Sequence, residues 1–261
     1  MFKRQPLLAY PLPAPVQQTQ FDLVEVFVHT LSEEEVKLQD GDVIAISSKY
    51  CSISEGNVIK FEDVSVTPEA EALATRYGMN PIVAQVVMSE ADHIFGGIQG
   101  FLLTFKDGIL SPNAGIDRSN IPNGQIVLFP VDPYASAARI REEIRARLGV
   151  TVGVILTDSW LMPGRLGTTG VALATAGFKP TQDERGKLDL FGNPMQVTVR
   201  GVADTICAAA QLVMGERDES MPFVIVRNTG VEMTEEPITV ADVAIEWERC
   251  IYVESLTKGL L

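Results

Sequence analysis

Three acidic residues at separate points of the chain, Asp117, Asp158 and Glu216, have similar sequence neighbours. Each lies just outside an apolar segment and beside a glycine or a hydroxyl-bearing residue. Carboxylate and hydroxyl oxygens at such positions suit a hard divalent cation, Mg²⁺ or Mn²⁺, and not Zn²⁺. A divalent cation would also allow an acidic protein to hold phosphate groups. We therefore expect one metal-dependent site if the fold brings these acids together.

Asp117 lies in a window, Asn113–Asn120, that combines a glycine, an acid, an arginine, a serine and two amides. Gly115 permits a positive φ or a close backbone approach. Prolines on both sides keep the window out of regular helix. Its composition alone is that of a polar surface turn. Because strand-like apolar segments flank it closely, a loop that carries site residues is the alternative.

Two more polar segments follow stretches that the sequence predicts as buried strands. The most apolar stretch, 150–156, ends in Thr157-Asp158-Ser159, and an acid beside hydroxyls at a strand end suits a metal ion with phosphate oxygens. After the strand expected at 42–46, the segment Ser47–Gly56 offers hydroxyls and Lys49, which suit an anion site. A solvated hairpin is an equally good interpretation of that segment.

Composition argues against several other chemistries. The formal net charge of −13 disfavours a general nucleic-acid-binding surface. The three cysteines are far apart and form no CxxC pair, which predicts reduced, buried thiols and no zinc site. Only two histidines exist, so histidine-based catalysis has little material, and His29 is expected to be structural. The glycine-rich segment 163–177 matches neither GxxxxGK[ST] nor GxGxxG, so we expect no P-loop or Rossmann motif.

Hydrophobic periodicity and cap residues predict interleaved helices and strands, preceded by a proline-rich edge strand or loop at 6–16. The arginines of the helix at 132–149 alternate with glutamates and are expected to face solvent. The pattern predicts a mixed α/β (α+β) fold in a single domain spanning residues 1–261, with two intertwined subdomains as the alternative. Helices are expected at 21–37, 67–78, 80–92, 132–149, 203–214 and 240–255, and strands at 42–46, 101–105, 125–129, 150–156, 196–200 and 223–226.

No apolar run approaches the ~20 residues that span a bilayer. The N-terminus lacks the apolar core of a signal peptide. We therefore expect a cytoplasmic protein without a membrane partner.

A series of motifs follows one another along roughly residues 40–230. They are Asp40-Gly41-Asp42-Val43-Ile44, Ser47-Ser48-Lys49, Ser54-Glu55-Gly56, Asn113–Asn120, Val152–Ser159, Gly167–Ala172, Gly186–Gly192, Val202-Ala203-Asp204 and Leu212–Glu216. In this order they resemble the coenzyme F420-0:L-glutamate ligase (F420-0 gamma-glutamyl ligase) family. The order is far more specific than any single motif.

The resemblance implies an intertwined homodimer that acts as a GTP-dependent glutamate ligase. It also implies Mg²⁺ or Mn²⁺ as cofactor, with a monovalent cation left open as an addition. The implied reaction joins the amino group of L-glutamate to a carboxylate of an F420-0-like acceptor. The acceptor carboxylate is first converted to an acyl phosphate by the γ-phosphate of GTP.

The family pattern assigns roles to the residues that match its motifs. Asp117 and Asp158 are implied to be catalytic and to bind metal, together with Ser159 and Glu216. The residues implied to border the nucleotide are Leu12, Pro13, Ser48, Lys49, Asn120, Met214 and Gly215.

Two departures from the family pattern leave alternatives open. Ile53 stands where the family usually has lysine, and this loss should weaken phosphate binding by ~1–3 kcal/mol unless Lys49 substitutes. The segment Trp160–Arg165 keeps one arginine and adds bulk near the expected acceptor site. The same chemistry on a pterin- or folate-like acceptor, and a catalytically inactive homologue that binds nucleotide and metal, are therefore the alternatives.

Overall fold

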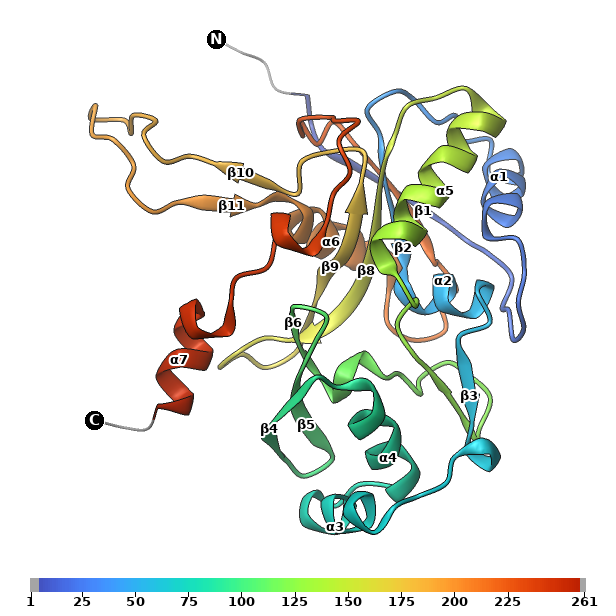
Figure 1. The fold of residues 1–261 in the computed structure, drawn as a ribbon. Helices are drawn as coiled ribbons and strands as arrows, with labels where there is room; N and C mark the ends of the chain where they lie inside the picture. The colour runs from blue at the N-terminus through green and yellow to red at the C-terminus, as the bar shows by residue number, and fades with distance from the viewer. Residues whose placement is uncertain (1–4, 259–261) are drawn as a thin grey trace. The chain divides into compact units, whose positions relative to one another are not determined.

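The computed structural model describes residues 5–258 and has a mixed α/β fold (Figure 1), which confirms the predicted fold class. The chain divides into two compact units, each built from two separate segments. The larger unit contains the chain up to Val64 together with Gly115–Ile238. The smaller unit contains Ser65–Ala114 together with the chain from Thr239 onward.

A five-stranded mixed sheet with the strand order β1-β12-β2-β8-β9 forms the centre of the larger unit. Strands β2 and β8 are parallel, and the other neighbouring pairs are antiparallel. Strand β1 lies at an edge of the sheet, where a proline is tolerated, so the predicted extended segment is an edge strand. The strands are β1 (Leu8–Leu12), β2 (Val43–Ser47), β8 (Gly153–Leu161), β9 (Thr168–Ala176) and β12 (Phe223–Arg227).

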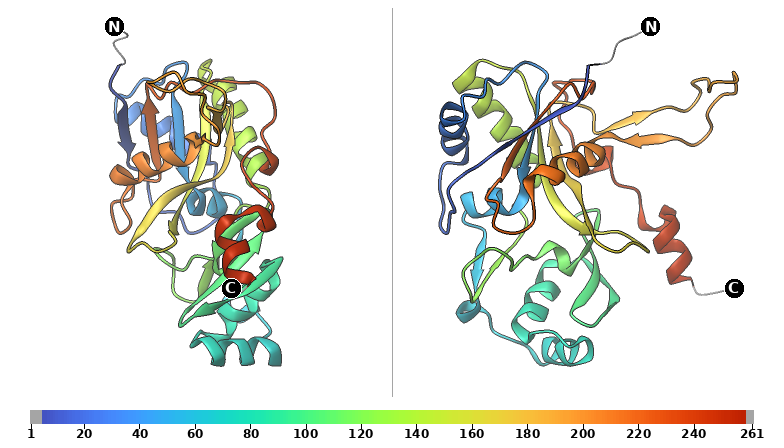
Figure 2. Two further views of the ribbon diagram at one scale, coloured as in Figure 1. Left: turned by 90° about the vertical axis from the view of Figure 1, so that its left-hand side faces the viewer. Right: turned by 180° about the vertical axis from the view of Figure 1, so that it is seen from behind.

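Helices cover both faces of this sheet because its central strands are apolar on both sides. On one face, α6 packs its buried side chains against Val43, Ile155 and Val224. On the other, Phe27 of α1 meets Phe223 with 5.2 Å between ring centroids. Figure 1 shows α1 and α5 to the right of the sheet, and the left view of Figure 2 shows α6 lying across its other face. These helices are α1 (Leu23–Glu33), α5 (Pro133–Leu148) and α6 (Val202–Met214).

Two short two-stranded sheets complete the larger unit. Strand β3 (Val58–Lys60) pairs with β7 (Gln125–Val127), and β10 (Thr181–Asp183) pairs with β11 (Val199–Gly201). The segment 181–201, here called the arm, extends away from the five-stranded sheet (Figures 1 and 2).

The smaller unit is an antiparallel meander, β4-β5-β6, with the three α-helices α3, α4 and α7 among its described residues. Trp247 packs against the rings of His93, Phe95 and Phe105, at centroid distances of 5.0, 5.3 and 5.5 Å. The segment around Trp247 therefore packs against the sheet of this unit. The elements are α3 (Pro68–Tyr77), α4 (Pro81–Glu90), β4 (His93–Ile98), β5 (Phe101–Lys106), β6 (Ile109–Pro112) and α7 (Ile251–Thr257).

Helices with strong cap signals form where the sequence predicts them. Thr67 Oγ1 accepts a hydrogen bond from the Ala70 N–H at 3.3 Å, and Asp132 Oδ1 accepts one from the Ala135 N–H at 2.9 Å. Each cap is followed by a proline at the first helical position, where its missing N–H costs nothing. Gly78 ends α3 in the left-handed conformation.

One hairpin interpretation and one helix prediction are wrong. The hairpin interpretation of Ser47–Gly56 fails because the segment folds into helix α2 (Ser48–Ser54), with six of its seven residues buried. The continuous helix expected at 240–255 is broken into two 3₁₀ turns, η3 (Val240–Asp242) and η4 (Trp247–Arg249), before α7 begins. Thr239 does form a capping box, but it closes a single turn.

Strand β9 was not predicted because its segment is rich in glycine. Gly170 packs so closely on α6 that an added Cβ would lie 2.5 Å from the Cys207 carbonyl oxygen, so backbone packing explains this glycine. Strand β4, which contains Gly96 and Gly97, was also not predicted. The expectation that the α5 arginines all face solvent is wrong for Arg141, which is buried and pairs through both Nη atoms with Glu235.

His29 lies in α1, where its largely exposed side chain pairs with Glu33 of the same helix. No helix among residues 5–258 combines the length and the hydrophobicity needed to cross a membrane.

Candidate active site

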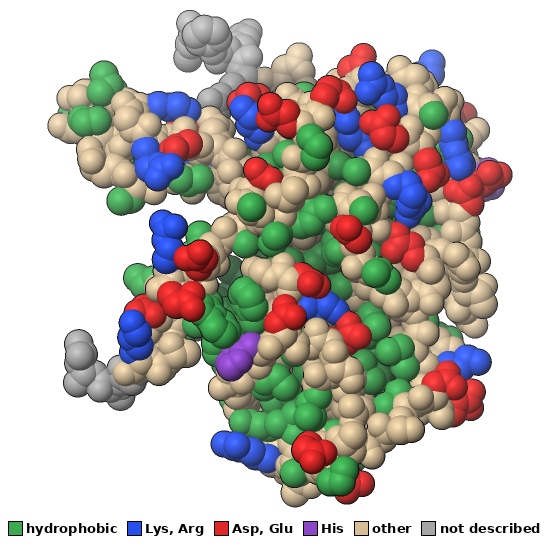
Figure 3. Space-filling model, in the orientation of Figure 1, with side chains coloured by type: hydrophobic (Ala, Val, Ile, Leu, Met, Phe, Trp, Pro, Cys, Tyr) green, Lys and Arg blue, Asp and Glu red, His purple; other side chains and the backbone are tan. Residues whose placement is uncertain are grey.

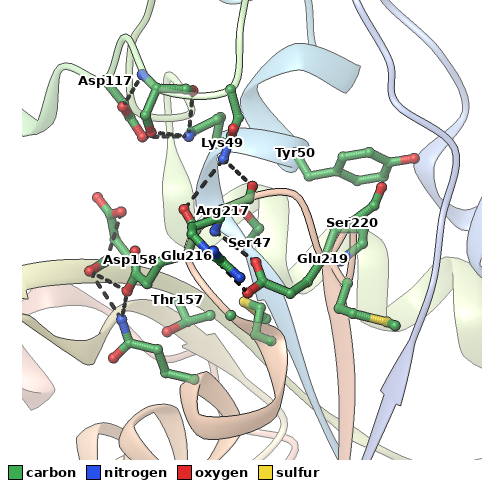
Figure 4. Close-up of a pocket in the computed structure, with 18 of the residues that line it drawn as sticks. Ser47, Lys49, Tyr50, Asp117, Thr157, Asp158, Glu216, Arg217, Glu219 and Ser220 are labelled. Carbon is green, nitrogen blue, oxygen red and sulfur yellow. Dashed lines mark hydrogen bonds and ion pairs between the residues drawn. The ribbon is translucent and has the colours of Figure 1, made fainter.

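A pocket of about 440 Å³ opens at the carboxyl ends of the parallel strands β2 and β8. Open α/β sheets commonly bind ligands beyond the carboxyl ends of their strands. The three acids Asp117, Asp158 and Glu216 share this one cavity (Figure 4). The predicted site residues that line it are Lys49, Asp117, Asn120, Asp158, Ser159, Met214, Gly215 and Glu216.

The backbone of Asp117 is fixed by an isolated bridge to Val127, with N–H···O distances of 3.0 Å in both directions. The loop can pass this close because Gly115 has a φ of +73° and faces the Phe129 ring, whose Cζ would lie 2.0 Å from an added Cβ. Asp117 Oδ1 accepts a hydrogen bond from the Ser119 N–H at 2.7 Å. The stretch thus lines the pocket through Asp117, Ser119 and Asn120, and its role in binding or catalysis stays a prediction.

Lys49 reaches Asp117 from the first turn of α2. Its Nζ lies 2.7 Å from Asp117 Oδ2 and donates to the Ser119 carbonyl at 2.7 Å and hydroxyl at 2.8 Å. Burial raises the pKa of the Asp117 carboxyl, but the positive charge of Lys49 and the hydrogen bonds outweigh it, so the net pKa is lowered. Asp117 is therefore ionised at neutral pH.

Asp158 lies on β8, just past a bulge between Leu156 and Thr157. Its Oδ1 accepts a hydrogen bond from the Ser159 N–H at 2.8 Å. Burial raises the pKa of Asp158 to about 6, and the negative charge of Asp117 adds to the shift. The two carboxylates are close enough to repel one another, and a cation between them would relieve that repulsion.

Glu216 enters the pocket from the loop that follows α6. Gly215 ends the helix with a φ of +75°, and an added Cβ there would meet the Glu219 carboxyl carbon at 2.4 Å. Ser159 Oγ lies 2.8 Å from Glu216 Oε1 and donates its proton to it. Gln211 donates to both groups, at 3.0 Å to Ser159 Oγ.

Asn120 connects two walls of the pocket. Its Nδ2 donates to the Arg217 carbonyl at 2.6 Å and lies 3.5 Å from the Glu216 carbonyl. Its φ of +53° is one that asparagine tolerates better than most residues. Asn120 therefore orders the loop after α6.

Comparison with known protein families finds a match over most of the chain. The model of that family, described as F420-0:Gamma-glutamyl ligase, matches residues 12–228. The chain belongs to the F420-0:gamma-glutamyl ligase family. This confirms the resemblance seen in the sequence, and the protein is a ligase.

Among the relatives, a protein of Methanopyrus kandleri named Coenzyme F420:L-glutamate ligase is 38% identical over 204 residues, which cover 78% of this chain and 81% of the relative. A protein of the same name from Methanothermobacter thermautotrophicus is 36% identical, with 79% of this chain and 82% of the relative covered. A third, from Methanocaldococcus jannaschii, is 39% identical over 74% of this chain and 78% of the relative.

Three residues implied by the family pattern do not line the pocket: Leu12, Pro13 and Ser48. Leu12 is fully buried in β1, and Ser48 is buried in α2. Their backbone neighbours line it instead, since Val16, Gln17, Ser47 and Tyr50 face the cavity. Ile53, which replaces the usual lysine of the ligase family, also lines the pocket and is buried.

The donor set fits a hard divalent cation. Among residues 5–258 no three side chains of His, Cys, Asp or Glu are already gathered tightly enough to form a metal cage. Mg²⁺, however, is usually held by one or two carboxylates plus water and substrate phosphates. Five carboxylates and only two cationic side chains line this ligase pocket. The excess negative charge and the mutual repulsion of Asp117 and Asp158 both favour cation binding.

Sequence reasoning missed Gln211 and Tyr50, which also line the site. Gln211 gave no signal because it follows an alanine-rich helical run and has no acid or glycine beside it. Gln211 lies five residues before Glu216, and the helix ends between them at Gly215. This spacing could have identified Gln211.

Proposed function

We propose that this ligase joins the amino group of L-glutamate to a carboxylate of an F420-0-like acceptor, with GTP as the energy source and Mg²⁺ or Mn²⁺ as cofactor. The observation that carries the proposal is the gathering of Lys49, Asp117, Asp158, Ser159 and Glu216 around one pocket. The name of the relatives, Coenzyme F420:L-glutamate ligase, and the family description, F420-0:Gamma-glutamyl ligase, support L-glutamate and an F420-type acceptor as the substrates.

The reaction proceeds in two steps. An oxygen of the acceptor carboxylate attacks the γ-phosphorus of GTP, so that a P–O bond to GDP breaks and an acyl phosphate forms. The amine of glutamate then attacks the acyl carbon, inorganic phosphate leaves with the C–O bonding pair, and the nitrogen loses a proton to form the amide. Neither step needs a covalent protein nucleophile, which agrees with the inert character of the buried thiols Cys51 and Cys207, whose pKa values are raised by burial.

Lys49 is the main fixed positive charge for the phosphates. Its ammonium already makes three contacts, all to the Asp117–Ser119 loop. When a phosphate oxygen enters, Lys49 exchanges one of these contacts for the phosphate, because an ammonium is a point charge that tolerates such changes of partner. Its position also compensates in part for the cation missing at Ile53.

The carboxylates of Asp117, Asp158 and Glu216, with the Ser159 hydroxyl, are the groups that would hold Mg²⁺ or Mn²⁺. A divalent cation there supplies neutralisation of charge on the transferring phosphoryl group. The acids themselves hold fixed positions through the Asp117–Val127 bridge and the hydrogen bond from the Ser159 N–H to Asp158.

The nucleotide is bound without a P-loop or Rossmann turn. Lys49, Asn120, Met214 and Gly215 line the cavity directly. Leu12, Pro13 and Ser48 act from behind it by fixing the backbone of the residues that do. The carboxyl ends of β2 and β8 thus replace a glycine-rich phosphate loop.

The arm supports assembly as a homodimer. Its large apolar side chains are exposed, with Leu190 and Phe191 at 99% and 89%. Figure 3 shows hydrophobic side chains on this projecting segment. Apolar side chains this exposed on an extended hairpin favour burial in a partner, and a second copy of the chain is the partner we propose.

The direct test combines purified protein, Mn²⁺, K⁺, GTP, L-glutamate and F420-0. We expect GDP and a glutamylated product in equal amounts, and no GDP when the acceptor is left out. The matched control is Asp158→Asn, which keeps the side-chain shape but should release no GDP.

Other outcomes decide between the alternatives. GDP release with a folate- or pterin-like carboxylate but not with F420-0 would change the acceptor and keep the chemistry. Tight binding of Mn²⁺–GTP without turnover of any acceptor would identify an inactive homologue. Folded protein that binds no Mn²⁺–GTP would overturn the proposal as a whole.

A further inference from the structure

Gln211 lies in the last turn of α6, beside two of the groups proposed to hold a divalent cation. Its Nε2 donates to Ser159 Oγ at 3.0 Å and to Glu216 Oε1. We propose that Gln211 is a positioning residue that sets which lone pairs of Ser159 and Glu216 face the cation. This inference rests on the proposed function.

The hydrogen bonds of the Ser159 hydroxyl to the described residues leave one of its two lone pairs available. The Ser159 hydroxyl donates a hydrogen bond to Glu216 Oε1 at 2.8 Å. One of the two Ser159 lone pairs accepts from Gln211. The second lone pair is then held in a fixed direction, as a metal ligand requires.

The two oxygens of the Glu216 carboxylate also have different roles. Oε1 receives Ser159 Oγ and Gln211 Nε2, and Thr168 Oγ1 lies 3.5 Å away. Within residues 5–258, no hydrogen bond or ion pair engages Oε2. The three donors therefore fix the carboxylate through one oxygen and leave the other for a cation.

The main chain of Gln211 strengthens this arrangement. Its carbonyl accepts the Gly215 N–H at 3.2 Å, which closes the last turn of α6. The side chain and the main chain of one residue thus set both the end of the helix and the carboxylate that follows it. Supporting hydrogen bonds of this kind change metal affinity by about 10–100-fold when they are removed.

Two substitutions at this position should act in opposite directions. Gln211→Met keeps the volume and removes both donated hydrogen bonds, so we expect Mn²⁺ affinity to fall by about 10–100-fold. Gln211→Glu adds a carboxylate next to Glu216. We expect it to lower the melting temperature without metal, through like-charge repulsion, and to give a larger Mn²⁺-induced rise in melting temperature than wild type. The neighbouring Leu212→Ala, at an 86% exposed side chain of the same helix, is the matched control and should behave as wild type.

The measurements are Mn²⁺ titration followed by electron paramagnetic resonance, with and without GDP, and thermal unfolding with and without Mn²⁺. They do not depend on turnover.

A residue that only packs the helix would lower the melting temperature in both variants and leave Mn²⁺ affinity unchanged, and this result overturns the inference. If Gln211→Met does not fold, the Gln211→Glu response alone decides, because an unchanged or smaller Mn²⁺ effect contradicts the inference. Wild-type protein that binds no Mn²⁺ overturns the inference and the proposed metal site together. Wild-type binding with unchanged variants overturns the inference alone.

Discussion

Two carboxylate–cation pairs lie near opposite ends of β2, and each has a nitrogen–oxygen distance of 2.7 Å. Asp42 precedes the strand and pairs with Arg227, whereas Lys49 follows the strand and pairs with Asp117. Asp42 is 1% exposed and Asp117 is 34% exposed. The comparison separates a pair that holds the fold from a pair that is available to a ligand.

The Arg227–Asp42 pair is complete. Arg227 donates to both carboxylate oxygens of Asp42 and to the Lys37 carbonyl, and its guanidinium lies 5.3 Å from the centre of the Tyr10 ring. The Gln39 N–H adds a further bond to Asp42. A planar, bidentate pair of this kind leaves no partner to exchange.

The Lys49–Asp117 pair is exchangeable. Lysine offers a point charge, and both of its partners belong to one loop that borders the pocket. The difference teaches that the length of an ion pair says little about its role. The burial of the carboxylate and the number of hydrogen bonds that it accepts distinguish the two pairs.

The largest expected effect sharpens this comparison on the structural side. Arg227→Met leaves Asp42 buried without its cation, so we expect the free energy of unfolding to fall by about 3–5 kcal/mol. Urea denaturation measures this. The control is Lys179→Met, which removes a half-exposed pair with a shorter distance of 2.6 Å to Glu232 and should change the midpoint little. Equal losses in the two variants would refute the distinction.

The second prediction concerns the other pair. Lys49→Met should weaken GTP binding by about 10–100-fold, because one charged hydrogen bond to a phosphate is lost. The free energy of unfolding should change by less than about 1 kcal/mol, since the pair is partly exposed. Calorimetry with GTP and Mn²⁺ measures the affinity, and the exposed Lys60→Met serves as the control. A large loss of stability with unchanged affinity would make Lys49 a structural residue.

The third prediction uses the acid next to that pair. Because burial raises the pKa of Asp158 to about 6, the folded protein binds more protons than the unfolded chain between pH 4 and pH 6. Stability should therefore fall as pH rises through this range. The asparagine of Asp158→Asn cannot ionise, so the free energy of unfolding of this variant should not fall in this way. The variant should be more stable than wild type by about 1–3 kcal/mol above pH 6.5 and equally stable near pH 4.

Urea denaturation across pH, without metal, tests the third prediction. The same variant should lose Mn²⁺-dependent GTP binding, so a gain in stability and a loss of ligand binding should occur together. A pH-independent difference between the two proteins would contradict the burial of the Asp158 carboxyl.

Much of the fold could be predicted because its signals are local. Thr67-Pro68, Asn80-Pro81 and Asp132-Pro133 each mark a helix start through a side-chain cap and a fixed φ, and all three helices form. Helix α2 and strand β9 could not be predicted in the same way. The structure of α2 depends on burying Tyr50 and Cys51, and that of β9 on the close approach of Gly170 to α6, which are tertiary effects.

The same distinction between local and tertiary signals applies to the polar residues. Asp117, Asp158 and Glu216 were found because acids beside glycine or hydroxyls stand out in sequence, and the structure brings them into one pocket. Gln211 and Arg141 have polar roles that only distant partners create, Ser159 for the first and Glu235 for the second. The metal-binding and catalytic roles assigned to Asp117, Asp158 and Glu216 remain predictions that the experiments above test.

The strand order has a consequence for how this ligase is made on the ribosome. Strand β12 lies between β1 and β2, yet it is the last strand of the chain to be synthesised. Until Arg227 has left the exit tunnel, β1 has no neighbour and one edge of β2 is open. The newly made polypeptide thus exposes β1 and one open edge of β2 until late in its translation, a state that favours association with other chains. Completion of the sheet, and with it a stable pocket, is a late event that follows the appearance of Glu216.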